Sequence, residues 1–188
     1  MKTVFITGGS RGIGKAMVEL FSEKGYVVGF TYKNSRESAL LLSEATGAYP
    51  YRADCESDAD IEAAVRSFTE EHGGIDVLIN NVGMSAFSLF TDISLDDWNK
   101  MLRVNLTSAF LFTKAALPNM ISKKWGRIIN VSSMWGVSGA SCEVHYSVIT
   151  TSTKPSPSLE ARNPFSSVSS IWNILTLLIK KGSLGSNS

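Results

Sequence analysis

Cysteine, proline and long apolar runs are scarce in this sequence of 188 residues, and these scarcities argue against several classes of protein. The two cysteines, Cys55 and Cys142, have no CxxC pair or histidine cluster beside them, which argues against a disulfide framework and a zinc site. The closest approach to a membrane span, at 171–179, is much shorter than the roughly 20 apolar residues that a spanning helix needs. We therefore expect no metal site, no membrane partner and a reducing, cytoplasmic location.

A strong charge of either sign is also missing. The 18 basic and 17 acidic side chains leave a formal net charge of +1, so charge favours neither nucleic acid nor an anionic membrane as a partner. No charged segment followed by an apolar one precedes the first strand-like run, so we expect no signal peptide. The length and the 44% hydrophobic content are typical of one globular domain.

What the sequence does contain is organised around the stretch Thr7-Gly8-Gly9-Ser10-Arg11-Gly12-Ile13-Gly14. It follows a short apolar run expected to be a buried strand, and it precedes a segment with helical spacing of apolar residues at Ile13, Met17, Leu20 and Phe21. Glycines allow a tight turn and close approach, and the free N–H groups of a first helical turn bind anions. The stretch therefore predicts a pyrophosphate site, although glycines also serve ordinary strand-to-helix loops.

Strand-like and helix-like segments alternate after this stretch. We expect strands at 26–32, 48–53, 75–79 and 127–133. We expect helices at 35–46, after an N-cap at Ser57, and from an N-cap at Ser94 through to Met120. Such alternation predicts right-handed βαβ units and an α/β fold, with a doubly wound parallel sheet and helices on both of its faces.

Polar motifs follow the expected strands at regular intervals. They are Asp54, the run Asn80-Asn81-Val82-Gly83, Asn105, Ser133, and Tyr146 thirteen residues after Ser133. With the glycine stretch, these motifs resemble in order and spacing those of the short-chain dehydrogenase/reductase family over residues 1–149, with Val82 where the family has alanine. The resemblance implies a Rossmann-like, NAD(P)-dependent oxidoreductase similar to the 3-oxoacyl-acyl-carrier-protein reductases, and homo-oligomers as in relatives.

The same resemblance implies roles for individual residues. Ser133 would polarise a substrate carbonyl, Tyr146 would donate a proton, and Asn105 would take part in a proton relay; a hydride arriving at a ketone needs such donors. The implied cofactor-binding residues are Thr7, Gly8, Ser10, Arg11, Gly12, Ile13, Gly14, Tyr32, Lys33, Asp54, Asn81, Val82 and Gly83. Alternatively, Ser133 is a turn residue and Tyr146 a half-buried aromatic.

The choice of cofactor is predicted from charge. A carboxylate after the second strand would bind the adenosine ribose and repel a 2′-phosphate, but the residues there, from Tyr32 to Arg36, include no acid. Arg11 and Lys33 are both able to pair with a phosphate, which favours NADPH over NADH. Alternatively, Lys33 and Arg36 are surface charges exposed to solvent.

The chain departs from the family pattern at Thr150, which stands where the family motif Tyr-x-x-x-Lys has lysine. Residues 150–188 are rich in Ser, Thr, Asn and Pro, match none of the later family strands, and are expected to form a flexible tail. The sequence thus leaves two functions open. One is an NADPH-dependent reductase of a ketone like a 3-oxoacyl thioester. Because 135–144 resembles a bacterial subgroup of the family, an aminopentanone-modified elongation factor P is an alternative substrate. The other is an inactive truncated or frameshifted fragment that at most binds the nucleotide.

Overall fold

The computed structural model describes residues 1–152, which belong to one compact unit. Within these residues, five parallel strands form one sheet in the order β3-β2-β1-β4-β5. The strands are β1 (Thr3–Ile6), β2 (Val27–Tyr32), β3 (Tyr49–Arg52), β4 (Val77–Asn80) and β5 (Arg127–Asn130). Pairing of Ile6 with both Phe30 and Ile79 places β1 at the centre, which confirms the predicted doubly wound sheet.

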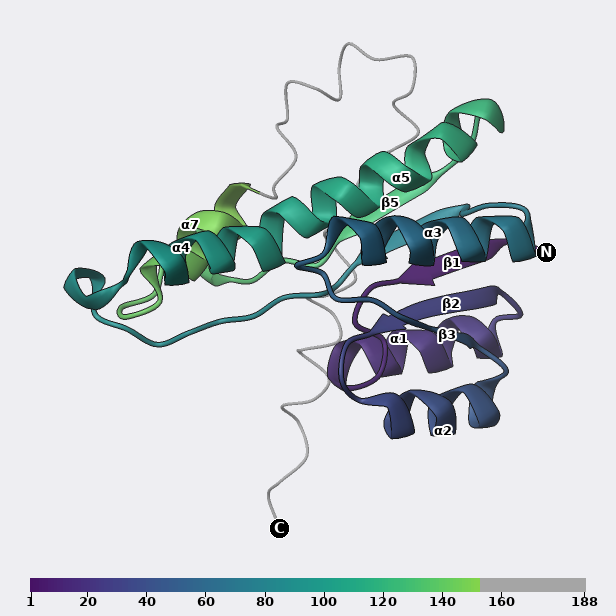
Figure 1. Ribbon diagram of the computed structural model, residues 1–188, viewed down its shortest axis with the longest axis horizontal. Coiled ribbons are helices and arrows are strands. Elements are labelled where there is room, and N and C mark those ends of the chain that lie inside the picture. The colour runs from purple at the N-terminus through teal and green to yellow at the C-terminus, as the bar shows by residue number, and fades with distance from the viewer. Residues whose placement is uncertain (153–188) are drawn as a thin grey trace. The chain divides into compact units, whose positions relative to one another are not determined.

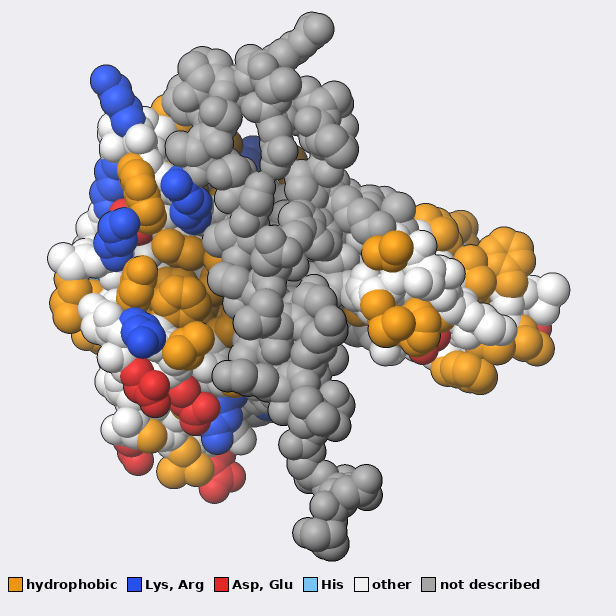
Figure 2. All heavy atoms as spheres, turned by 180° about the vertical axis from the view of Figure 1, so that it is seen from behind, with side chains coloured by type: hydrophobic (Ala, Val, Ile, Leu, Met, Phe, Trp, Pro, Cys, Tyr) orange, Lys and Arg blue, Asp and Glu red, His pale blue; other side chains and the backbone are white. Residues whose placement is uncertain are grey.

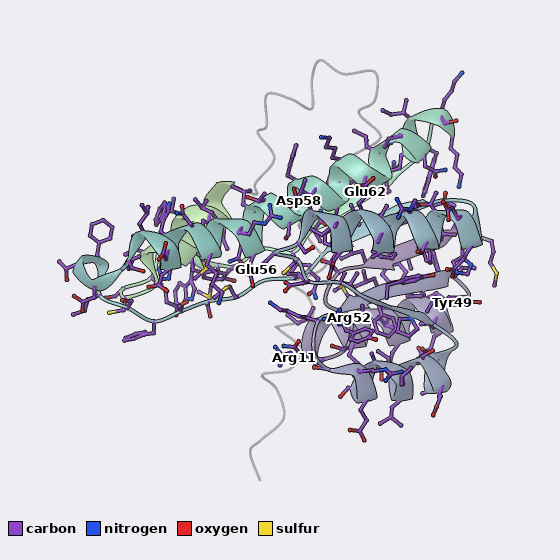
Figure 3. The ribbon with its side chains drawn as sticks, in the orientation of Figure 1. Arg11, Tyr49, Arg52, Glu56, Asp58 and Glu62 are labelled. Atoms are coloured by element: carbon purple, nitrogen blue, oxygen red, sulfur yellow. The ribbon has the colours of Figure 1, made fainter. Side chains whose placement is uncertain are left out.

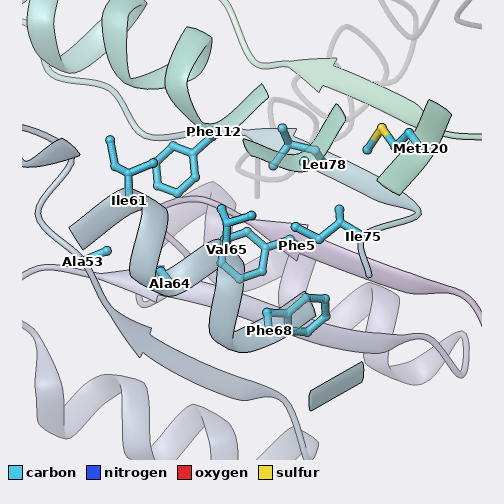
Figure 4. Close-up of a cluster of buried hydrophobic side chains, with 11 residues drawn as sticks. Phe5, Ala53, Ile61, Ala64, Val65, Phe68, Ile75, Leu78, Phe112 and Met120 are labelled. Carbon is cyan, nitrogen blue, oxygen red and sulfur yellow. The ribbon is translucent and has the colours of Figure 1, made fainter. Parts of the chain in front are cut away.

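Helices cover both faces of the sheet (Figure 1). One face carries α1 (Gly12–Glu23) and α2 (Arg36–Thr46), while the other carries α3 (Asp58–His72) and α5 (Ser108–Ser122). Val4 and Ile6 of β1 belong to the core beneath α1 and α2. Phe5 points to the opposite face, where it packs with Phe68 and Phe112 (Figure 4). Alternation along one central strand therefore supplies both cores.

The remaining elements lie at the carboxyl edge of the sheet. They are η1 (Phe90–Asp92), α4 (Leu95–Leu102), η2 (Arg103–Thr107), α6 (Trp135–Ser138) and α7 (Val144–Ser152). The helices α4, η2 and α5 run on from one another, because the π-helical turn η2 closes through an N–H bond from Ser108 to the Arg103 carbonyl. No helix among residues 1–152 is long and apolar enough to cross a membrane.

Both predicted helix caps are confirmed. The Ser57 hydroxyl accepts the N–H of Asp60 at 3.2 Å, and the Ser94 hydroxyl accepts the N–H of Asp97 at 3.1 Å. Each serine satisfies one of the donors that the start of a helix leaves open. The predicted tail at 150–188 falls almost entirely outside the described residues and stays a prediction.

The apolar spacing predicted the helix α1 and part of the face that it buries, because Met17 and Phe21 pack against the core. Ile13 and Leu20 are 51% and 43% exposed, whereas Gly14 and Val18 are buried. A Cβ on Gly14 would collide with the Gly8 carbonyl, so the close contact between helix and glycine loop determines the rotation of α1. The strand predicted at 127–133 ends early, at Asn130, although the N–H of Val131 still donates to the Asn80 carbonyl.

Candidate active site

The glycine loop is held against the end of β2. The N–H of Gly8 donates to the Thr31 hydroxyl at 3.0 Å, and the N–H of Gly9 donates to the Thr31 carbonyl at 2.9 Å. Gly8 has a φ of +69°, in the left-handed region that glycine adopts without a Cβ penalty. The loop therefore turns sharply between β1 and the exposed residues that begin α1, as a binding site for a pyrophosphate requires.

The start of α1 presents its N–H groups to this loop. Arg11 occupies the N-cap position, and its side chain makes no capping hydrogen bond to the described residues. The bond from the Lys15 N–H to the Arg11 carbonyl is the first turn's own, which leaves the earlier N–H groups of α1 available to an anion. Arg11, Gly12 and Ile13 are exposed there, while Ser10 and Gly14 are buried.

Thr7 and Asn81 join the glycine loop to the segment after β4. The Thr7 hydroxyl accepts the N–H groups of both Asn81 and Val82 at 2.9 Å. In return, the Asn81 amide donates to the carbonyls of Thr7 at 2.9 Å and Gly8 at 3.2 Å. A Cβ on Gly8 would lie 2.9 Å from Cγ2 of Val82, and one on Gly14 would lie 2.8 Å from the Asn81 amide nitrogen. The predicted residues Thr7, Gly8, Gly14 and Asn81 thus come together in one group, which we call the cradle.

The predicted residues of the adenosine end also lie together, but with additional partners. Tyr32 ends β2, where it pairs with Arg52 of β3. The Lys33 ammonium lies 2.8 Å from Asp54 Oδ2 and 3.0 Å from Glu56 Oε1. Burial raises the pKa of Asp54, but the hydrogen bonds from Lys33 and from the Glu56 N–H outweigh it and hold that pKa below its ordinary value.

At the catalytic end, Asn105 sits in η2 with its side chain already engaged. Its Oδ1 accepts the N–H of Met84 at 2.9 Å, and its Nδ2 donates to the Met101 carbonyl at 3.0 Å. A Cβ on Gly83 would lie 2.9 Å from Asn105 Oδ1, so the run from Asn80 to Gly83 reaches directly to η2. π-Helical turns are frequent at functional sites.

Ser133 and Tyr146 lie on neighbouring segments. The Ser133 hydroxyl accepts the N–H of Trp135 at 3.3 Å, which uses a lone pair and leaves the O–H able to donate. Tyr146 is half-buried in α7, a helix that packs against α4, α6 and η2. A bond of 3.0 Å from the Ser132 hydroxyl to the Thr150 carbonyl ties α7 to the end of β5.

Thr150 does not take the place of a lysine. Its buried hydroxyl donates to carbonyls of its own helix, those of Tyr146 at 2.8 Å and Ser147 at 3.1 Å. Ser133 and Tyr146 therefore bring a hydroxyl and a phenol to neighbouring segments, while position 150 carries no charge. In the part of the chain that the structure describes, no three His, Cys, Asp or Glu side chains gather as metal ligands.

Two residues of the site were not predicted from the sequence. Arg103 of η2 donates from Nε and Nη2 to the Glu56 carbonyl, at 3.1 and 2.9 Å, and pairs with the Asp58 carboxylate. Glu56, which Figure 3 labels beside Asp58, shares Lys33 with Asp54. Lys33 and Arg103 lie 23 and 47 residues from Glu56 in the sequence, so no local pattern indicates these pairs.

Known proteins resemble this chain in sequence. Residues 2–149 match the family model for short chain dehydrogenase. The chain is 36% identical over 151 residues to the 3-oxoacyl-acyl-carrier-protein reductase FabG of Aquifex aeolicus, covering 78% of this chain and 61% of that protein. It is 34% identical over 146 residues to the acetoacetyl-CoA reductase of Paracoccus denitrificans, covering 78% and 60%.

A solved structure agrees with these sequence matches. A doubly mutated short-chain dehydrogenase/reductase from Serratia marcescens superposes with a TM-score of 0.74 at 31% identity, covering 80% of this chain and 63% of the other. The chain spans about three-fifths of the length of the curated relatives named above. The family match covers every candidate site residue described above except Thr150. The chain belongs to the short-chain dehydrogenase family.

Proposed function

We propose that this chain binds NADPH and reduces the ketone of a 3-oxoacyl thioester or a similar compound. The observation that carries the proposal is the cradle of Thr7, Gly8, Gly14 and Asn81. A side chain on Gly8 would crowd Val82, and one on Gly14 would collide with the Gly8 carbonyl. The names of two relatives, a 3-oxoacyl-acyl-carrier-protein reductase and an acetoacetyl-CoA reductase, support the substrate class.

The residues at the catalytic end suit the reduction of a carbonyl. The nicotinamide, when bound, supplies a hydride to the carbonyl carbon. The Ser133 O–H would donate a hydrogen bond to the carbonyl oxygen, and the Tyr146 phenol would transfer its proton to that oxygen to complete the alcohol. The side chain of Asn105 already bonds to Met84 and Met101. We therefore assign the proton relay to the backbone groups of Asn105 in η2.

Apolar side chains beside this site suit an acyl substrate. Phe87, Leu89 and Phe90, between β4 and α4, are 80%, 58% and 69% exposed. Figure 2 shows hydrophobic side chains gathered on the end of the molecule where α4 and α7 lie in Figure 1. The N–H of Ser88 donates to the Cys142 carbonyl at 2.8 Å, which ties this loop to the residues just before α7. An acyl chain reaching Tyr146 would therefore pass along apolar surface.

Thr150 supports a second candidate, a chain that binds the nucleotide without turnover. A cation near a phenol favours proton transfer at neutral pH, and the loss of such an acid–base partner commonly costs about 10²–10⁴ in rate. Position 150 lies one helical turn after Tyr146, on the same face of α7. A lysine there would supply that cation, whereas the threonine hydroxyl bonds within the helix.

Oxidation of NADPH with acetoacetyl-CoA tests these alternatives, together with direct measurement of NADPH binding. We expect slow turnover that Tyr146→Phe abolishes and that Thr150→Lys increases about 100-fold. Thr150→Met, which adds length without charge, serves as the matched control and should leave the rate unchanged. Binding without turnover in every variant, Thr150→Lys included, would favour the second candidate; a chain that binds no dinucleotide would overturn both.

A further inference from the structure

Lys33 is shared between two carboxylates that lie in the loop between β3 and α3. Its ammonium lies 2.8 Å from Asp54 and 3.0 Å from Glu56, and it remains 44% exposed. Lys33 therefore faces two carboxylates, and Arg52 is near enough to Asp54 to help lower the pKa of that carboxyl. No acidic residue follows β2 in the sequence. The carboxylates beside this position come instead from the residues that follow β3.

The cluster stands where the adenosine ribose of a dinucleotide would lie. In doubly wound sheets the group that contacts the ribose 2′ position follows the second strand, on the same edge as the glycine loop. Lys33 directly follows β2, and the Gly9 N–H bonds to the carbonyl of Thr31, two residues earlier. Tyr32 pairs with Arg52, so β2 and β3 end side by side at this edge of the sheet.

Glu56 is held in this place by its own backbone. The Arg103 guanidinium donates twice to the Glu56 carbonyl, and the Glu56 N–H donates to Asp54 Oδ1 at 3.0 Å. Ser57, the next residue, begins α3 as its N-cap. Because both backbone polar groups of Glu56 are bonded, the backbone adds little further entropy cost when the carboxylate pairs with Lys33.

We infer that Glu56 is a cofactor-discriminating residue, whose carboxylate engages Lys33 and disfavours a 2′-phosphate at the adenosine ribose. Lys33 alone would attract the phosphate of NADPH, whereas with Glu56 beside it the added negative charge opposes that attraction and leaves NADH the better able to compete. This inference rests on the proposed binding of a nicotinamide dinucleotide. It concerns the preference between the two cofactors and not the reaction itself.

The test measures the dissociation constants of NADPH and NADH for the whole chain and for Glu56→Gln. Glutamine keeps the size of the side chain and an oxygen that can accept from Lys33, so only the charge is removed. We expect the affinity for NADPH relative to NADH to rise about fivefold, as removal of one partly screened charge predicts, and the rise to shrink at high salt. Glu62→Gln removes the same charge from the exposed face of α3 and should leave the ratio unchanged (Figure 3).

Different failures of this experiment have different meanings. If the chain binds both dinucleotides but Glu56→Gln leaves the ratio unchanged or shifts it toward NADH, the role of Glu56 is overturned and the proposed function stands. If Glu62→Gln changes the ratio equally, the effect is a general one of net charge, and the inference fails as well. If neither dinucleotide binds to the unaltered chain, the proposed function and this inference fall together. Thermal melts of each variant separate these results from a loss of folding.

Discussion

At the scale of single residues, Thr7 has the most consequential position in the cradle. Its side chain is 1% exposed, and its hydroxyl accepts two backbone N–H groups from the segment after β4. Thr7→Val keeps the shape and removes the acceptor, so two largely buried donors lose their partner. We expect the free energy of unfolding, measured in urea, to fall by about 2–4 kcal/mol.

A matched variant distinguishes the hydroxyl from the methyl group at this position. Thr7→Ser keeps the oxygen and removes one methyl, so most of the stability should remain, with a loss of about 1 kcal/mol. Equal destabilisation by Thr7→Val and Thr7→Ser would contradict the role given to the hydroxyl.

Residue-level prediction from the sequence worked where a motif is contiguous and failed where partners lie far apart. Thr7, Gly14 and Asn81 were predicted from short motifs, and the structure brings them together. Lys33 was identified, but its pairing with Glu56 was not, because the two residues meet only when β2 and β3 align. The contact of Arg103 with Glu56 has the same cause, since it depends on how η2 crosses the end of β3.

At the scale of elements, periodicity predicted which segments form helices better than it predicted how they are rotated. In α1 the predicted Met17 and Phe21 pack against the core, whereas Ile13 and Leu20 are exposed and Gly14 and Val18 are buried instead. The absence of a side chain at Gly14 decides this, because a helix that touches the glycine loop must present its smallest residue. Hydropathy gives glycine no such weight, so the sequence pattern misses the rotation.

Asp76 joins three elements at the opposite edge of the sheet. Just before β4, its carboxylate accepts the N–H of Thr3 in β1 at 3.0 Å and pairs with Lys123, after α5, at 3.1 Å. Burial raises the pKa of Asp76, but the bonds from Thr3 and Lys123 outweigh it and hold the pKa below the ordinary 3.8. The ionised carboxylate thus stabilises the fold.

We expect Asp76→Asn to lower the free energy of unfolding by about 1–2 kcal/mol at neutral pH, since asparagine loses the charged partner of Lys123. A depressed carboxyl pKa contributes stability above its unfolded value and loses it as pH falls through the folded value. The difference between the two proteins in urea unfolding should therefore be complete near neutral pH and narrow below pH 3.8. A difference that stays constant down to strongly acidic pH would contradict this account.

At the scale of the whole molecule, alternation of strands and helices was enough to predict the sheet and its edge. The strand order β3-β2-β1-β4-β5 departs in opposite directions from β1, and ligands of such sheets bind where the order reverses. Thr7 follows β1 and Asn81 follows β4, so the cradle spans this point. The sequence does not predict the structure around α7 in the same way, because Thr150 breaks the family pattern there.

The folded chain as a whole should be stabilised by a dinucleotide that binds this edge, because the strand ends meet only after folding. At 100 times the dissociation constant, such a ligand adds about 2.7 kcal/mol to the free energy of unfolding. For a chain of this size that corresponds to a rise in Tm of about 5–10 °C.

Gly12 offers a test of where the ligand binds. It is exposed at the start of α1 with a φ of +55°, and a Cβ there would meet no atom within 4 Å, so Asn and Asp, which adopt this region more readily than other side chains, carry a similar backbone strain there. Gly12→Asp places a carboxylate beside the N–H groups that would bind the pyrophosphate, whereas Gly12→Asn places a neutral side chain of equal size there. The rise in Tm with NADPH should survive largely in Gly12→Asn and disappear in Gly12→Asp, because the carboxylate competes for the helix start and repels the phosphates. Equal rises in both variants would place the dinucleotide elsewhere on the molecule.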